Sequence, residues 1–171
     1  LAALDLKLRE KLLVELIDLQ ETLKTTFIYV THDQTEALVV ADQMAIMNYD
    51  GEIEQIGTPK QIYEFPVSTF VANFVGTNNI FKGYLHVHDQ VSFEIPDLGE
   101  FIVAVPEGAG GIAENNEMYL SLRPEKILIS MQPVEGFANH LTGEVEAIIY
   151  QGRATQYNIR LKNDRIIHVF E

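Results

Sequence analysis

The hydrophobic period of the chain changes near Asn79, and this change limits the possible folds more than any other feature. Before it, leucines recur at the three- and four-residue spacing of an amphipathic helix. They are Leu12, Leu16, Leu19 and Leu23. After it, apolar residues alternate with polar ones, as in strands with one buried face. They are Val91, Phe93, Ile95, Phe101, Val103, Val105, Tyr157, Ile159 and Leu161. We therefore expect one domain over residues 1–76 and an all-β domain over 77–171.

The second domain also carries turn signals between its alternating runs. They are Asp97 to Gly99, Gly108 to Gly111, Gly143, Gly152 and Asn163-Asp164. Short strands joined by such turns need a shared core, which predicts a small antiparallel barrel or sandwich. The period alone leaves both architectures open.

The first domain is expected to mix helices with strands. Thr26 to Thr31 is continuously apolar and aromatic between its threonines, which predicts a strand inside a parallel sheet. A short helix from Gln34 to Ala41 should follow it. Next, Met44–Met47 and Ile53–Ile56 flank a turn at Gly51 and predict an antiparallel hairpin.

Two more short helices are predicted before the domain boundary. Thr58, Pro59 and Gln61 supply a hydroxyl cap, a first-turn proline and the reciprocal partner of a capping box. The second helix, Ser68 to Val75, ends at Gly76. Its apolar face should pack into the core of the first domain.

A histidine lies where the predicted parallel strand meets the next helix. His32 precedes Asp33, a residue type that caps helices, and Glu36 stands three residues later as in a capping box. Ligands bind outside the carboxyl ends of strands in α/β sheets, so the imidazole could donate a hydrogen bond to an anionic oxygen. The alternative is a histidine that only bonds a backbone carbonyl.

Composition excludes several classes of protein. The chain has 12 basic and 25 acidic residues, a formal net charge of −13, which argues against a nucleic-acid partner. No apolar run reaches the roughly 18 residues of a membrane span. The absence of cysteine excludes disulfides and thiolate chemistry.

Several motifs, in order, resemble the ATP-binding subunits of ABC importers, in the branch that serves sugar and polyamine uptake. Ala2 to Asp5 resembles the D-loop, with Ala2 in place of its serine, and Thr31-His32-Asp33 resembles the switch-histidine segment. Other motifs resemble the end of the nucleotide-binding domain and the C-terminal TOBE barrel. They are Asn48 to Pro59, Ile62 to Pro66, Leu122 to Glu125, Gly143 to Val145 and Tyr150 to Gly152.

This resemblance implies the remnant of an α/β nucleotide-binding domain followed by an OB-like TOBE barrel. In the family, His32 would contact the γ-phosphate of ATP. Ala2, Ala3, Leu4 and Asp5 would communicate across a nucleotide-sandwich homodimer. ATP and Mg²⁺ would be the cofactors of the complete protein. The implied partners are a second ATPase subunit, transmembrane permease subunits and, indirectly, a solute-binding protein, at the cytoplasmic face of the membrane.

The chain lacks the phosphate loop, the signature motif and the acidic strand end that phosphoryl transfer requires. In the family, Leu1 would directly follow the Asp-Glu-Pro segment, so the sequence resembles a C-terminal piece. Family members usually have further strands after the position of Glu171, so the barrel can be incomplete here. We expect the chain alone neither to hydrolyse ATP nor to bind it tightly.

Other assignments remain open at this point. Residues Gly76 to Phe81 resemble polyamine importers (spermidine and putrescine) more than maltose importers, with sugar, ferric iron and sulfate as alternative cargoes. A noncatalytic regulatory or dimerisation module that binds a small ligand is the alternative function. His86 and His88 would share a strand face, but no third metal ligand accompanies them at a convincing spacing, so no metal site is expected.

Overall fold

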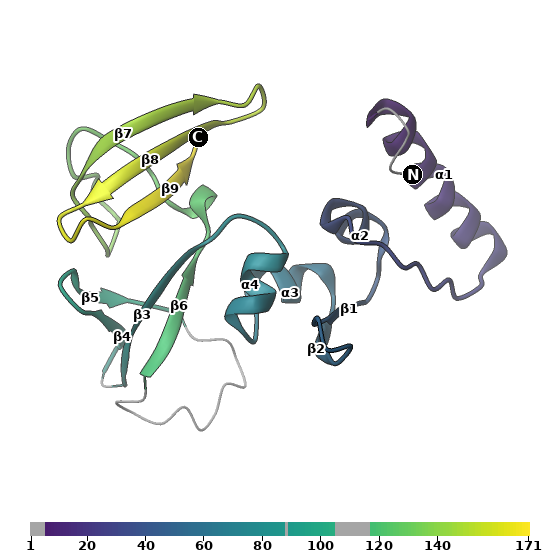
Figure 1. The fold of residues 1–171 in the computed structure, drawn as a ribbon, viewed down its shortest axis with the longest axis horizontal. Helices are drawn as coiled ribbons and strands as arrows, with labels where there is room; N and C mark the ends of the chain where they lie inside the picture. Colours follow the sequence, from purple (N-terminus) through teal and green to yellow (C-terminus); the bar gives the residue numbers. More distant parts are fainter. Residues whose placement is uncertain (1–5, 88, 105–116) are drawn as a thin grey trace. The chain divides into compact units, whose positions relative to one another are not determined.

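The computed structural model describes residues 6–87, 89–104 and 117–171 (Figure 1). The chain divides into two compact units, and the boundary along the sequence lies between Gly76 and Thr77. Each unit has a buried apolar cluster of its own. The two units are therefore described separately.

The described part of the first unit is mainly helical, with one hairpin. Its elements are α1 (Leu6–Leu23), α2 (Gln34–Val40), β1 (Met44–Met47), β2 (Ile53–Gly57), α3 (Pro59–Glu64) and α4 (Thr69–Phe74). The predicted hairpin is confirmed, since β1 and β2 pair antiparallel and Gly51 has φ of 82° in the turn. The capping box of α3 is also present, with Thr58 and Gln61 bonded reciprocally.

The core of this unit joins the hairpin to α3 and α4. Ile62 and Val71 are completely buried, and Ile46 of β1 packs in the same cluster. Ser68 caps α4 by accepting from the Val71 amide at 3.2 Å. The predicted apolar face of this helix therefore packs as expected.

The predicted parallel strand from Thr26 to Thr31 is wrong for the described structure. The segment is extended but belongs to no sheet, and it bonds to none of the described strands. Ile28 is 91% exposed and Val30 is 90% exposed. An interior strand needs paired strands along its edges and packed layers on both faces of its sheet, and the described strands include no partner for this segment.

The leucine stripe predicted for α1 is only partly correct. Leu12 and Leu16 are half-buried, but Leu19 and Leu23 are exposed, whereas Leu13, which lies outside the predicted stripe, is buried. In the described residues, α1 packs chiefly on the short helix α2, which is too small to cover a stripe of this length.

The second unit consists of two antiparallel sheets. The four-stranded sheet has the order β5-β4-β3-β6, and the three-stranded sheet has the order β7-β8-β9. The strands are β3 (Asn79–Val87), β4 (Val91–Ile95), β5 (Gly99–Ile102), β6 (Glu117–Leu122), β7 (Gly143–Tyr150), β8 (Thr155–Leu161) and β9 (Ile166–Phe170). A 3-10 turn, η1 (Pro124–Lys126), follows β6.

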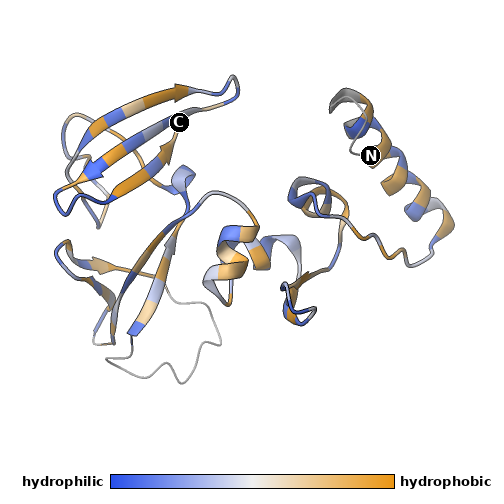
Figure 2. Ribbon diagram, viewed as in Figure 1, coloured by the Kyte–Doolittle hydropathy of each residue, from blue (hydrophilic) through white to orange (hydrophobic). Residues whose placement is uncertain are grey.

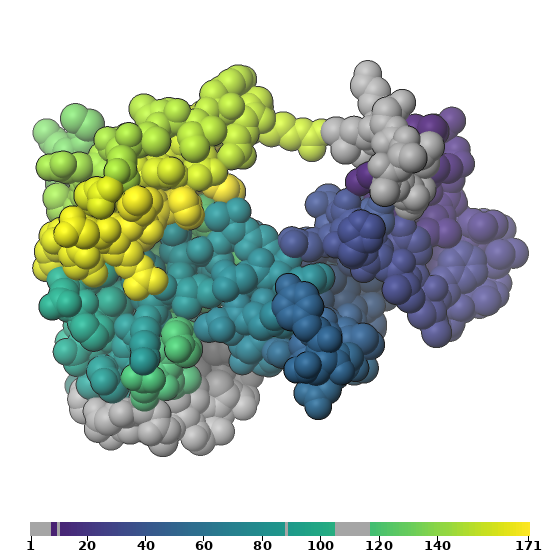
Figure 3. All heavy atoms as spheres, in the orientation of Figure 1, coloured from purple at the N-terminus to yellow at the C-terminus, as the bar shows by residue number. Residues whose placement is uncertain are grey.

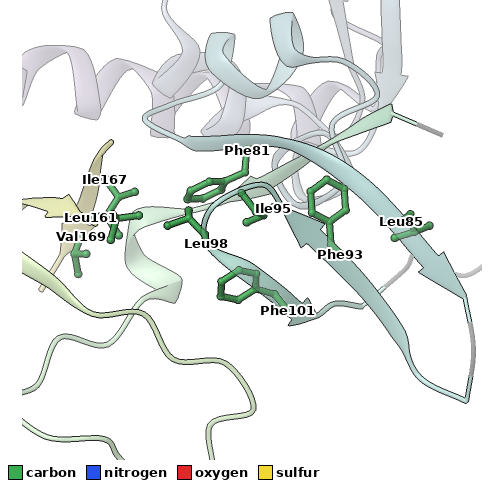
Figure 4. Packing of buried hydrophobic residues seen from close by; sticks show 9 residues of the cluster. All are labelled: Phe81, Leu85, Phe93, Ile95, Leu98, Phe101, Leu161, Ile167 and Val169. Atoms are coloured by element: carbon green, nitrogen blue, oxygen red, sulfur yellow. The ribbon is translucent and has the colours of Figure 1, made fainter. Parts of the chain in front are cut away.

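One apolar core lies between these two sheets. Figure 4 shows Phe81, Ile95 and Leu98 gathered on one side, with Leu161 and Ile167 facing them from the other sheet. In the space-filling view the yellow C-terminal strands lie directly against the teal residues of this unit (Figure 3). Among the described residues no strand ladder joins the sheets, so a shared core and side-chain bonds hold them together.

The turn predictions have mixed outcomes. Asp97, Gly99, Gly152 and Asp164 have positive φ angles, as tight turns require. Gly143 is instead the first residue of β7, where a Cβ atom would meet the Ile159 side chain. Val105 and the segment 108–111 lie outside the described residues.

Candidate functional site

His32 lies in the bend between the extended segment and α2, and its side chain is exposed. Its imidazole makes no hydrogen bond within the part of the chain that the structure describes. The alternative of a histidine satisfied by a backbone carbonyl is therefore not observed. The ring is free to act as a hydrogen-bond donor.

Asp33 caps α2 as expected. Its Oδ1 atom accepts hydrogen bonds from the amides of Thr35 at 2.9 Å and Glu36 at 3.3 Å. The predicted capping box is wrong, however. The Asp33 amide donates to Thr31 Oγ1 at 3.0 Å, because the Glu36 carboxylate has other donors.

Glu36 is the buried acid of this region, with only 4% of its surface exposed. One of its oxygens, Oε2, accepts from Thr31 Oγ1 at 2.7 Å and from the Tyr29 hydroxyl at 2.8 Å. These bonds, first that of Thr31 and then that of Tyr29, lower the pKa of Glu36. Desolvation and the Glu36 carboxylate raise the pKa of Tyr29. The glutamate is therefore ionised and the phenol neutral near pH 7.

Arg9 joins this group of residues from α1. Its NH1 nitrogen lies 2.8 Å from Asp33 Oδ2, and its Nε lies 3.7 Å from Glu36 Oε1. One guanidinium thus faces both carboxylates and connects α1 with the start of α2. An arginine suits this position because its planar fork offers several fixed donors.

Not all of the predicted site residues belong to the part of the chain that the structure describes. Ala2, Ala3, Leu4 and Asp5 lie outside the described residues, so their relation to His32 stays a prediction. Arg9 and Tyr29 were not among the site residues predicted from the sequence. A usable signal for Tyr29 was a hydroxyl-bearing residue two positions before Thr31 in an otherwise apolar run.

The second unit offers no comparable cluster among its described residues. His86 Nε2 lies 3.0 Å from Glu94 Oε2 across the β3–β4 pair, and His88 lies outside the described residues. No group of three potential metal ligands occurs in the described ranges. An open depression beside η1 is lined by Ile127, Phe137 and Phe170, among others.

A different feature of the second unit is the exposed strand β7. It lies at the edge of its sheet, and seven of its eight residues are exposed. Much of the strand is hydrophobic (Figure 2). Its exposed apolar side chains are Val145, Ile148, Ile149 and Tyr150.

Comparison with known proteins identifies a domain family in the C-terminal part of the chain. Residues 120–171 match the TOBE domain family, which confirms that the chain carries a TOBE domain. Within the described residues, no helix is both long and apolar enough to cross a bilayer.

Particular relatives extend the similarity to the whole chain. It is 42% identical to the spermidine/putrescine import ATP-binding protein PotA of Thermotoga maritima over 100% of its length. It is 39% identical to PotA of Protochlamydia amoebophila over 97% and 41% identical to PotA of Trichormus variabilis over 100%. The chain spans 45% to 46% of the length of these curated relatives. The similarity confirms the resemblance to importer ATP-binding subunits.

Proposed function

We propose that this chain is the C-terminal portion of the ATP-hydrolysing subunit of an ABC importer. The first unit would be the end of the α/β nucleotide-binding domain, and the second would be the TOBE domain. Similarity to PotA proteins along the chain supports this proposal. The structural observation that carries it is the exposed His32 imidazole in a turn fixed by hydrogen bonds on both sides.

In the proposed role, His32 donates a hydrogen bond to the γ-phosphate of ATP. Loss of that contact after hydrolysis would release the closed state of a homodimer. When bound to the complete protein, ATP would supply the phosphoryl group and Mg²⁺ would offset the charge of its oxygens. The exposed imidazole fits a phosphate contact, whereas the described residues include no cluster of three acids or histidines for the metal. Because its sequence lacks the phosphate loop, the signature motif and the acidic strand end, we expect this chain alone not to hydrolyse ATP.

Spermidine or putrescine is the proposed cargo of the importer. Support comes from the names of the relatives, which are polyamine import proteins in three organisms. The TOBE match does not favour a polyamine over sugar, ferric iron or sulfate. Permease subunits and a second ATPase subunit would be the direct partners.

The test is His32→Ala in the complete ATP-binding subunit assembled with its permease. ATPase activity and polyamine uptake should both fall about 100-fold, in the range that the loss of one positioned hydrogen-bond donor costs. His140→Ala is the matched control, since His140 is also an exposed histidine but lies in the second unit. Wild-type ATPase activity in the His32→Ala protein would refute the proposed role.

A regulatory or dimerisation module is the second candidate function, and the exposed apolar side chains of the edge strand β7 favour it. The two candidates can be separated by nucleotide dependence. A complete subunit whose dimerisation ignores ATP, and whose second unit binds a small solute saturably, would favour the module. ATP-dependent dimerisation would favour the motor.

A further inference from the structure

The hydroxyl of Thr31 is the centre of the hydrogen-bond network around His32. Thr31 Oγ1 donates to Glu36 Oε2 at 2.7 Å, and it accepts from the Asp33 amide at 3.0 Å. The Thr31 hydroxyl therefore links the backbone amide of Asp33, the residue after His32, to the Glu36 side chain of α2. A hydrogen bond that the amide two residues later donates to this hydroxyl oxygen closes a tight local turn.

The acceptor for this hydroxyl is itself held in place. Glu36 is buried on α2, and the Tyr29 hydroxyl donates to the same oxygen at 2.8 Å. Charge-assisted bonds of this kind are stronger than neutral ones. Arg9 adds a second restraint by binding Asp33 from α1. The residues on both sides of His32 are thus anchored, while its ring projects into solvent.

We propose that Thr31 is a positioning residue that fixes the His32 turn for contact with the terminal phosphate, with Glu36 and Tyr29 holding its hydroxyl. This inference rests on the proposed function of His32. Thr31 would set the geometry of the phosphate contact without touching the nucleotide itself. Small displacements of a reacting or contacting group can lower a rate by up to about 100-fold, so such a residue has a measurable effect.

Two substitutions at residue 31 separate the hydroxyl from the shape of the side chain. Thr31→Val keeps the volume and branching but removes both hydrogen bonds. Thr31→Ser keeps the hydroxyl and loses only a methyl group. Thr25→Val is the matched control, because the Thr25 hydroxyl is exposed and bonds only the nearby Leu23 carbonyl at 3.1 Å.

The experiment measures kcat and KM for ATP in the complete subunit assembled with its permease. Thr31→Val should lower kcat about tenfold with KM changed less than about twofold, since the turn affects the phosphate contact more than overall binding. Thr31→Ser and Thr25→Val should stay within about twofold of wild type. An unchanged kcat in Thr31→Val, or an equal loss in Thr31→Ser, would overturn the inference.

The same test includes His32→Ala, so that the two proposals can fail separately. If His32→Ala is inactive while Thr31→Val is normal, the positioning role is wrong and the function stands. If His32→Ala is fully active, the proposed function is wrong. Hydrogen exchange of the Asp33 amide in the 171-residue chain gives a reading without nucleotide. Exchange should accelerate in Thr31→Val and remain slow in Thr31→Ser, and equal rates in both would contradict the proposed turn.

Discussion

At the scale of single residues, two asparagine side chains in the second unit make the hydrogen bonds that a neighbouring strand would otherwise make with its backbone. The Asn79 amide donates to the His168 carbonyl and accepts from the His168 amide, both at 2.8 Å. Asn139 makes the same pair of bonds with Ile102, also at 2.8 Å. A side-chain amide carries the donor and acceptor of a peptide group, so each asparagine can satisfy a strand residue. Asn79 thereby links β3 to β9, across the two sheets.

We expect Asn79→Asp to lower the free energy of unfolding of the chain by about 3 kcal/mol, because a buried carboxylate cannot donate to the His168 carbonyl. Asn79 is only 5% exposed, so water cannot take over the lost bond. Urea denaturation followed by circular dichroism measures the effect. Asn139→Asp is the control with the same change of charge, and its exposed site should cost less than about 1 kcal/mol. Equal losses would show that burial of Asn79 is not the cause.

Some site residues could be predicted from the sequence, and others could not. Asp33 follows a local rule, since a capping residue is recognised by its position before a helix, and its cap is confirmed. The partners of Glu36 were not predictable in the same way. A capping box and a contact with Thr31 compete for the same carboxylate, and only the path of the backbone decides between them.

At the scale of elements, β3 organises the four-stranded sheet by changing partners along its length. Residues 79–84 of β3 pair with β6, and residues 84–87 pair with β4. Gly83 stands just before the change. A Cβ atom added there would lie 2.6 Å from the Phe93 ring and would collide with the Glu94 carbonyl oxygen. The absence of a side chain therefore allows β4 to approach β3.

Gly83→Ala should destabilise the second unit by about 2 kcal/mol, because the added methyl group overpacks the β3–β4 contact. Thermal unfolding followed by circular dichroism would measure this loss. Lys82→Ala is a suitable control on the same strand, because Lys82 is exposed and only pairs with Glu117 at 2.9 Å. Its effect should be at most about 1 kcal/mol. A Gly83→Ala protein as stable as wild type would mean that β4 shifts without cost.

Elements specified by neighbouring residues were predicted well. The hairpin at Gly51 and the cap at Thr58 depend on interactions within a few residues. The strand expected at Thr26 to Thr31 depends on partners distant in sequence, and an apolar run alone does not supply them. Likewise, the exposed Leu19 shows that helical spacing predicts a face but not what covers it.

At the scale of the whole molecule, the two units have separate cores. The buried cluster of the first unit includes Met44, Ile62 and Val71, all before Gly76. The cluster of the second unit comes entirely from residues after Thr77, with Phe81 and Val169 almost completely buried. A unit that buries its own core can fold without its neighbour.

We expect residues 77–171, produced alone, to unfold in one cooperative transition, because their core needs no residue of the first unit. Differential scanning calorimetry should give equal calorimetric and van't Hoff enthalpies. Phe81→Ala serves as the comparison, since removing a buried phenylalanine should cost about 3 kcal/mol or more. A broad transition with strong binding of a hydrophobic dye would contradict independent folding.

The extended ribbon around Ile28 and Val30 has a practical consequence for handling the chain. Its β-branched side chains and unused backbone groups form a template on which other copies could stack as cross-β structure. A net charge of −13 on every molecule opposes such stacking through mutual repulsion. Since dissolved ions shorten the reach of that repulsion, the tendency of the chain to form fibrils should rise with ionic strength.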